Sequence, residues 1–274
     1  MNAPERHLVL SHAGRPPTFA IKAINAAGET VSVAIPCEHP LTLYVDKREV
    51  VTLMTLGGDP EALTLGYLRN QQLIDALDDI TSVQVDWEVN AVAVTTRSGS
   101  GPAAARLERR TITSGCGQGT MFGAVMDGLA PLQLPAATAL SASRLHRLID
   151  AVRERQCIYR QAGSVHGCAL ARNTDETELL YFIEDVGRHN AVDAIAGRMW
   201  LDGEGGADKI FHSTGRLTSE MVIKAAQMGI PFLVSRSGVT QMAWEIAQRL
   251  GLTLIGRARN RQYLIYTGAE RFLR

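Results

Sequence analysis

The sequence has only four cysteines among its 274 residues, and they lie far apart, at positions 37, 116, 157 and 168. No two of them form a C-x-x-C pair, and their spacing matches no zinc-binding pattern. Such sparse thiols are typical of a protein in a reducing compartment rather than of one held together by disulfide bonds. The sequence therefore predicts neither a disulfide framework nor a bound metal.

The chain also lacks an excess of charge and a long apolar run. Lys and Arg together number 28, and so do Asp and Glu, so no overall field attracts the protein to nucleic acid or to a membrane surface. No apolar run approaches the length of a membrane span, and residues 1–6 lack the apolar core of a signal peptide. We therefore expect a cytoplasmic protein that binds neither nucleic acid nor a membrane, and any anion site must be a local cluster.

What the chain does have in its first half is the pattern of β-strands. Apolar and polar residues alternate through residues 83–89, which indicates a strand with one exposed face. One helix is expected as well, with Asp59 as its N-cap and Pro60 at its first position. The elements expected here are strands over residues 41–45, 50–54, 83–89, 91–95 and 106–111 and a helix over residues 60–68.

A segment rich in proline and alanine, residues 131–140, separates this part from the second half, where strands and helices alternate. We expect helices over residues 143–152, 191–199, 219–228 and 239–250, and strands over residues 165–170, 179–183, 209–212, 231–235, 253–256 and 263–266. Such alternation is typical of a three-layer α/β sheet. The expected fold is α/β, or α+β overall, with a β-rich domain over residues 1–135 and a three-layer α/β/α domain over residues 136–274.

Cys116 stands in a loop of small residues, 113–119, that follows an expected strand. Neighbouring glycines let the backbone approach a partner closely, so a second molecule could reach the sulfur. A structural cysteine usually lies in an apolar run, because the free thiol behaves as a small hydrophobe. Two interpretations are open at this point: a reactive thiol, or a tight turn that happens to contain a cysteine.

Two turns that each join a strand to a helix, residues 213–219 and 235–238, combine glycine, hydroxyl groups and an arginine. Such a turn offers free backbone N–H groups and the positive end of a helix dipole, and it lies where open α/β sheets bind ligands. Ordinary N-capping by Ser or Thr would also explain the hydroxyl groups. The candidate binding residues in these turns are Gly215, Arg216, Ser235 and Ser237.

Residues 257–262 alternate arginine with uncharged residues. If this segment is extended, all three guanidinium groups lie on one face, where their forks could bind phosphate oxygens. A solvated edge strand carrying charge is the alternative. The candidate residues are Arg257, Ala258, Arg259, Asn260, Arg261 and Gln262.

His189 lies in a dense polar segment, residues 184–190, directly after a strand expected to be buried. So many polar residues at a strand end favour a functional or interface role for this histidine. Packing positions are expected instead for His166, Cys157 and Cys168.

The segment EDVGRHNAVDAIAG, residues 184–197, closely resembles a signature of the FdhD family, the accessory sulfurtransferases of formate dehydrogenase. The resemblance extends in order along the chain beyond about the first twenty residues. Further matching segments are residues 38–42, 65–68, 113–117, 164–166, 213–226 and 229–231. The resemblance implies a second half similar to the cytidine deaminase fold.

It also implies a sulfur carrier that receives sulfur from a cysteine desulfurase as a persulfide on Cys116. The carrier then passes this sulfur to a bis-guanine-dinucleotide molybdenum (or tungsten) cofactor before the cofactor enters formate dehydrogenase. The nucleotide-binding segment of the family matches residues 257–262 here, with GDP as an analogue of the cofactor ends. The two turns and His189 are expected to complete this site, and a homodimer is expected.

Two features depart from the patterns to which the chain is compared. Some relatives carry C-x-x-C in the reactive loop, whereas the second position here is Gly119, which leaves a single persulfide on Cys116. A zinc deaminase needs H-x-E followed by P-C-x-x-C, which the chain lacks, so deamination is not expected. A cofactor chaperone with an inert Cys116 and a nucleotide hydrolase of deaminase-like fold are the remaining alternatives.

Cys116 must be a thiolate to attack a persulfide. At an ordinary pKa near 8.5, only about 3% of a cysteine is ionised at pH 7, and lowering the pKa by about two units raises that share to roughly three quarters. A cationic neighbour would have this effect, and Arg188 and His189 are the candidates by chemistry.

Overall fold

The computed structural model describes residues 8–99, 134 and 138–274. Cys116, its loop at residues 113–119 and the strand expected over residues 106–111 lie outside the described residues, as does most of the expected domain boundary. Their structure, and the division into two domains, stay predictions.

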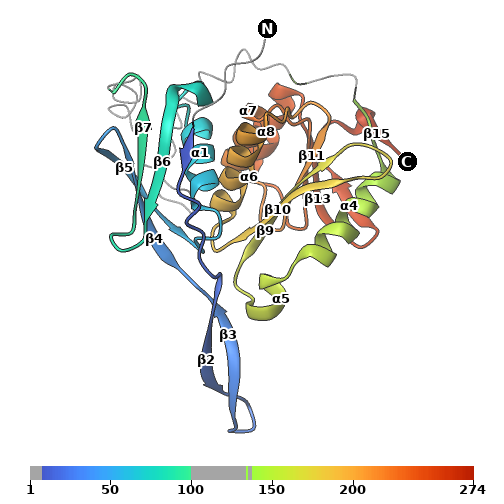
Figure 1. Cartoon of the computed structure of the whole chain (residues 1–274). Helices are drawn as coiled ribbons and strands as arrows, with labels where there is room; N and C mark the ends of the chain where they lie inside the picture. The colour runs from blue at the N-terminus through green and yellow to red at the C-terminus, as the bar shows by residue number, and fades with distance from the viewer. Residues whose placement is uncertain (1–7, 100–133, 135–137) are drawn as a thin grey trace.

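The first part of the chain forms a five-stranded sheet with one helix packed on it (Figure 1). The hairpin, the two later strands and the helix expected from the sequence are confirmed, and Asp59 is the N-cap of that helix, with Pro60 at its first position. In sheet order the strands are β1 (Val9–Leu10), β6 (Ile80–Asp86), β7 (Ala91–Thr96), β4 (His39–Val45) and β5 (Arg48–Thr55), and the helices are α1 (Pro60–Asn70) and the 3₁₀ turn η1 (Leu77–Asp79).

The second part forms a six-stranded sheet with helices on both faces. Its order is β10 (Leu179–Asp185), β9 (His166–Arg172), β11 (Lys209–Ser213), β12 (Phe232–Ser235), β13 (Thr253–Arg259) and β14 (Gln262–Ile265). The helices are α4 (Ala142–Arg155), α5 (Ile158–Ala162), α6 (Arg188–Asp202), α7 (Ser219–Gln227) and α8 (Gln241–Leu250). A short pair, β8 (Leu140–Ser141) and β15 (Phe272–Leu273), and the turn η2 (Ala269–Arg271) complete the described elements.

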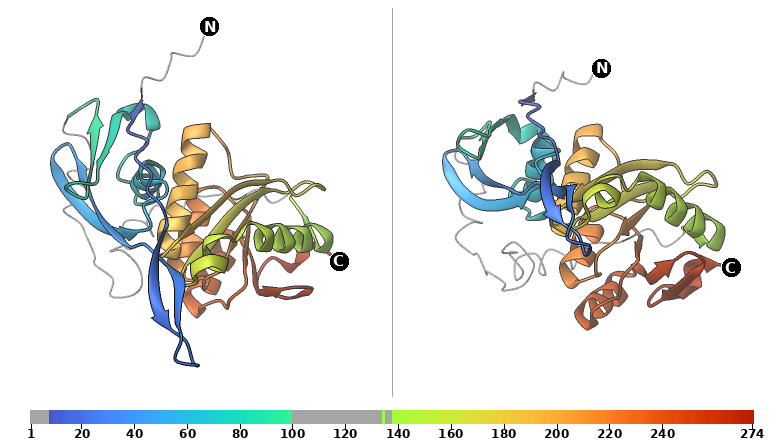
Figure 2. Two further views of the ribbon diagram at one scale, coloured as in Figure 1. Left: turned by 60° about the horizontal axis from the view of Figure 1, so that its bottom comes forward. Right: turned by 90° about the horizontal axis from the view of Figure 1, so that it is seen from below.

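The central strands β11, β12 and β13 run parallel, whereas β9, β10 and β14 are antiparallel to their neighbours. Alternate residues of the strands face opposite layers: Phe211 and Leu233 pack with α6, α7 and α8, and Ile210 and Val234 pack with α4. The chain is therefore a mixed α+β protein, and the expected three layers around this sheet are confirmed (Figure 2). Among the described residues, no helix is both long and apolar enough to cross a membrane.

The two parts are joined by close contact between α1 and α6, which lie between the two sheets (Figures 1 and 2). The contact depends on two glycines, because a Cβ atom on Gly66 would overlap the carbonyl oxygen of Asp193, and one on Gly197 would overlap that of Ala62. Apolar residues of both parts belong to one continuous core.

We expect Gly66→Ala to destabilise the protein by about 1–3 kcal/mol, because a methyl group forced against a backbone carbonyl in a packed core must shift a helix. This loss would occur although alanine is the better helix former by about 1 kcal/mol. Urea unfolding measures the change. Gly205→Ala is the matched control, since its added Cβ meets no atom within 4 Å; equal stability of the two variants would contradict the close contact.

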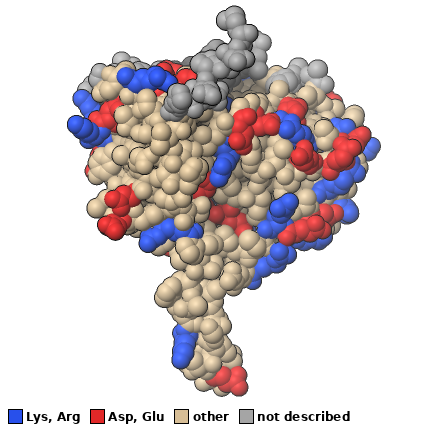
Figure 3. All heavy atoms as spheres, viewed as in Figure 1, with Lys and Arg blue, Asp and Glu red and all other residues tan. Residues whose placement is uncertain are grey.

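A two-stranded arm, formed by β2 (Thr18–Ile24) and β3 (Thr30–Pro36), projects from the body (Figures 1 and 3). The sequence patterns did not predict it. The pairing register places only apolar side chains on one of its faces, and Phe19 among them is 62% exposed. These residues are Phe19, Ile21, Ala23, Val31, Val33 and Ile35.

Candidate functional site

The two predicted binding turns lie side by side, because they follow the parallel neighbours β11 and β12. The backbone N–H of Arg236 donates to the carbonyl of Ser213 at 3.2 Å, and the hydroxyl of Ser235 donates to the carbonyl of Gly215 at 2.5 Å. Ser235 is fully buried, and this hydrogen bond connects the two turns. Ser237 joins the same arrangement, because its N–H donates to the Ser235 hydroxyl at 2.8 Å.

The hydroxyl groups of these turns do not act as ordinary helix caps. The N-cap residues of α7 and α8 are Thr218 and Thr240, and neither makes a side-chain capping hydrogen bond. The capping interpretation of the two turns is therefore not supported at either helix. Backbone N–H groups in the first turn of a helix have no intrahelical partner, and groups of this kind are suited to bind an anion.

Three arginines surround the first turn, and none of them has a carboxylate partner among the described residues. Arg188 is buried and its Cδ would lie 2.8 Å from a Cβ on Gly215, whereas Arg216 is exposed. Burial, followed by the charges of Arg188, Arg236 and Arg216, lowers the pKa of the nearby His166. Within the described part of the chain, none of these arginines forms an ion pair. His166 is partly exposed, so the expectation that it is a buried packing residue is wrong.

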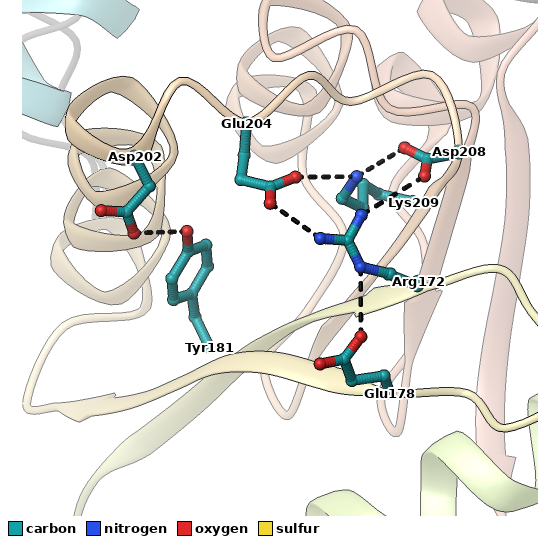
Figure 4. Close-up of polar contacts among 7 residues, drawn as sticks. All are labelled: Arg172, Glu178, Tyr181, Asp202, Glu204, Asp208 and Lys209. Carbon is teal, nitrogen blue, oxygen red and sulfur yellow. Dashed lines mark hydrogen bonds and ion pairs between the residues drawn. The ribbon is translucent and has the colours of Figure 1, made fainter.

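The opposite end of the same strands shows the contrasting arrangement (Figure 4). There Glu204 contacts Arg172 at 2.8 Å and the buried Lys209 at 3.1 Å, and Glu178 and Asp208 add further pairs. Among the described residues, the cations where β11 begins form ion pairs, whereas Arg188, Arg216 and Arg236, near its end, form none. The carboxyl ends of the parallel strands are consequently the positive end of the sheet, which suits an anionic ligand.

A cavity of about 410 Å³ opens at this positive end, between α4, α5 and the ends of the parallel strands. Ile149 and Val152 of α4 provide an apolar wall, and Arg236 and Arg259 provide charge. The guanidinium of Arg236 lies 5.5 Å from the ring centre of Tyr159, a cation–π contact that holds both at the cavity. Among the described residues, the cavity is lined by Ile149, Val152, Arg153, Gln156, Tyr159, His212, Thr214, Arg236, Ala258, Arg259 and Asn260.

The arginine segment is bent and does not form one extended strand. Arg257 has a left-handed φ of 51°, and the β13–β14 pairing shifts between Gly256 and Arg259, as in a β-bulge. Asn260 and Arg261 then form the turn between the strands. The expectation that all three arginines share one face by simple alternation is therefore wrong, because the bulge and the turn both interrupt it.

Each residue of this segment consequently has its own surroundings. Arg259 lines the cavity and its Nε donates to the carbonyl of Arg236 at 3.3 Å, whereas Arg257 is exposed and does not line the cavity. Arg261 pairs with Asp150 of α4 at 3.2 Å. Ala258, one of the candidate residues, is buried and lines the cavity, although simple alternation would turn its side chain away from the arginines. Gln262 is exposed at the start of β14.

His189 lies in the first turn of α6 and is buried, with Nε2 3.2 Å from Oε2 of Glu220. Burial, followed by the charges of Lys224 and Arg188, lowers its pKa to about 2, so the imidazole is neutral at pH 7. It is not among the residues that line the cavity. The expectation of a cationic His189 that activates Cys116 is therefore wrong, and Arg188 is the remaining candidate.

The described cysteines differ sharply in exposure. Cys168 is fully buried, as expected, and burial raises the pKa of its thiol to about 12. Cys157 is exposed, so the expectation that it is a buried packing residue is wrong. Its Sγ lies 3.7 Å from Oε2 of Glu184. In the described residues, no group of three or more His, Cys, Asp or Glu could hold a metal ion.

The geometry defines a mixed α+β protein with a cationic cavity at the carboxyl ends of parallel strands. The chain belongs to the FdhD/NarQ family, whose model matches residues 36–273, and the expected family is confirmed. It is 33% identical over 261 residues to the sulfur carrier protein FdhD of Sulfurisphaera tokodaii, covering 92% of this chain and 98% of that relative. It is also 30% identical over 245 residues to the protein of that name from Listeria innocua, covering 89% and 93%.

A solved structure shares the fold. The chain resembles a candidate formate dehydrogenase accessory protein from Desulfotalea psychrophila with a TM-score of 0.75 and 26% sequence identity. The match covers 94% of this chain and all of the other. The similarity therefore includes both sheets rather than one of the two parts.

Proposed function

We propose that this protein is a sulfur carrier for the maturation of formate dehydrogenase. It takes sulfur from a cysteine desulfurase as a persulfide on Cys116 and delivers it to a bis-guanine-dinucleotide molybdenum cofactor before that cofactor enters the apoenzyme. The observation that carries the proposal is the cationic cavity of about 410 Å³. It occurs in a chain that matches proteins named sulfur carriers along nearly their whole length.

The sulfur moves in two steps. The Cys116 thiolate attacks the outer sulfur of the desulfurase persulfide, the S–S bond of the donor breaks, and the donor cysteine leaves as a thiolate. The outer sulfur of the new persulfide then passes to the metal, which frees the Cys116 thiolate. This second step reduces a persulfide sulfur to sulfide and takes two electrons, which a thiol reductant supplies as it is oxidised to a disulfide.

The cavity is suited to one guanosine end of the cofactor, and GDP is its analogue. Ile149 and Val152 would pack on the base and sugar, and Arg236 and Arg259 would bind phosphate oxygens. Gly215 and Arg216, in the neighbouring turn, extend the positive surface beyond the cavity. Ser235 and Ser237 contribute by fixing that turn. His189 is a less suitable contact, because it is buried beside Glu220.

The protein would work in the cytoplasm as a homodimer, and the apolar face of the β2–β3 arm is one exposed surface available to a second copy. We also propose that its six-stranded part is related to the cytidine deaminase fold, without the deaminase residues. This relation rests on the resemblance of the sequence and on the observed layers.

Mass spectrometry of the protein after incubation with a cysteine desulfurase and cysteine tests the carrier function. We expect a gain of one sulfur atom on Cys116, lost on treatment with a thiol reductant. If the protein binds GDP but Cys116 never gains sulfur, the protein is a cofactor chaperone and the carrier function is wrong.

A further inference from the structure

A buried imidazole, that of His212, lies in the wall of the cavity. His212 is the fourth residue of β11 and faces α4 together with its cross-strand neighbours Ala169 and Val234. It is only 3% exposed and lines the cavity. An imidazole in this position stands where the apolar wall of α4 meets the strand ends.

This imidazole has an unmet hydrogen-bonding group. Its Nδ1 is buried and finds no hydrogen-bond partner in the described structure. Burial, followed by the charge of Arg236, lowers its pKa to about 4, so the ring is neutral at pH 7 and carries one N–H donor and one acceptor lone pair. Leaving a buried polar nitrogen without a partner is unfavourable, so a ligand that completes this bond binds more tightly.

The charged groups around the cavity determine which hydrogen-bonding group of a ligand is left for the imidazole to bind. Arg153, Arg236 and Arg259 are donors only, so they suit phosphate oxygens and cannot accept a hydrogen bond from the base. The N1–H donor of guanine then needs an acceptor that is not cationic. The neutral imidazole of His212, which lines the cavity, has one such acceptor nitrogen.

We infer that His212 binds the purine base, with its Nδ1 accepting a hydrogen bond from N1–H of guanine. The inference rests on the proposed binding of a guanine nucleotide in this cavity. It assigns His212 to the base and the arginines to the phosphates, and thereby sets the orientation of the nucleotide. Adenine has an unprotonated N1 at the same place, so two acceptors would meet, and ADP would gain nothing from His212 unless the imidazole changed its tautomer.

The test compares the affinities of the wild type and variants for GDP, IDP, ADP and inorganic pyrophosphate by calorimetry. We expect His212→Leu to weaken GDP and IDP binding roughly tenfold, as the loss of about 1.4 kcal/mol implies. ADP and pyrophosphate binding should not change, because neither uses Nδ1. His212→Gln, which keeps an acceptor, should bind GDP with intermediate affinity.

His146→Leu is the matched control. His146 also has a buried ring nitrogen without a partner in the described residues, but it does not line the cavity. If His212→Leu weakens GDP and pyrophosphate equally, the residue is structural and the inference is wrong; unchanged GDP affinity would also overturn it. Persulfide formation on Cys116 should be normal in His212→Leu, so loss of the carrier function is scored separately from loss of base binding.

Discussion

Cys116→Ala is expected to abolish persulfide formation and sulfur transfer while leaving the protein folded. The thiolate is the nucleophile that receives sulfur, and alanine offers no atom that could replace it. Because the loop around Cys116 consists mostly of small residues, removing the thiol should change the free energy of unfolding by less than about 1 kcal/mol, as at ordinary surface positions. Mass spectrometry after incubation with a desulfurase measures the persulfide, and thermal unfolding measures stability.

The other cysteines are the matched controls for this experiment. The buried thiol of Cys168 has a pKa of about 12, so it is not a thiolate at neutral pH and cannot accept sulfur. Cys157 is the sharper control, because it is exposed and could react. We expect its replacement, and that of Cys37, to leave sulfur transfer nearly unchanged. A persulfide on Cys157 with Cys116 unmodified would move the carrier site to the start of α5.

A different failure would identify Cys116 as a structural residue. If Cys116→Ala loses several degrees of melting temperature together with its affinity for GDP, the cysteine packs in the protein interior. Normal folding, normal GDP affinity and no persulfide would together separate the sulfur site from the nucleotide site.

The sheet could be predicted from the sequence because burial imposes simple patterns. The short apolar run at residues 231–235 has the composition of a strand covered on both faces, and β12 forms there. The apolar face of residues 239–250 follows the helical period, and α8 forms there with Ala243 and Ile246 buried. β12 lies in the central layer and all of its residues are buried, whereas α8 lies in an outer layer and buries only one face.

The candidate site was predicted only in part, because local pattern does not determine where chain segments meet. The turns at Gly215 and Ser235 follow from strand order, and they do lie together. Tyr159 and Gln156 come from the distant α5 region, and no local signal links them to the strand ends. His212 did leave a signal, as a polar residue within a strand that is otherwise apolar at Ile210 and Phe211.

The arginine segment shows why an alternating pattern can mislead. Period 2 predicts a common face only while every residue is extended. The left-handed φ of Arg257 inserts a bulge, which leaves that residue exposed and turns Ala258 toward the cavity. The pattern around His189 was misleading for another reason. The helix α6 begins inside the protein, so His189 is buried beside Glu220 and does not face the cavity.

Arg259→Ala is expected to weaken GDP binding by roughly ten- to a hundredfold. A charge-assisted hydrogen bond to phosphate contributes about 1.5–3 kcal/mol, and 1.4 kcal/mol corresponds to a factor of ten. Arg259→Lys should be intermediate, because it keeps the charge but loses the two-pronged fork. Affinity should also fall as salt concentration rises, since part of the attraction is screened. Calorimetric titration with GDP and with pyrophosphate measures all of these effects, and both ligands should weaken together.

Arg257→Ala is the matched control for this prediction, because Arg257 carries the same charge two residues away but does not line the cavity. A small effect there and a large one at Arg259 would show that position, rather than overall charge, determines binding. If instead Arg259→Ala binds GDP as tightly as the wild type, the phosphates do not lie at β13. They would then be assigned to the turn at Gly215 and Arg216, where Arg188 is buried without a carboxylate partner among the described residues.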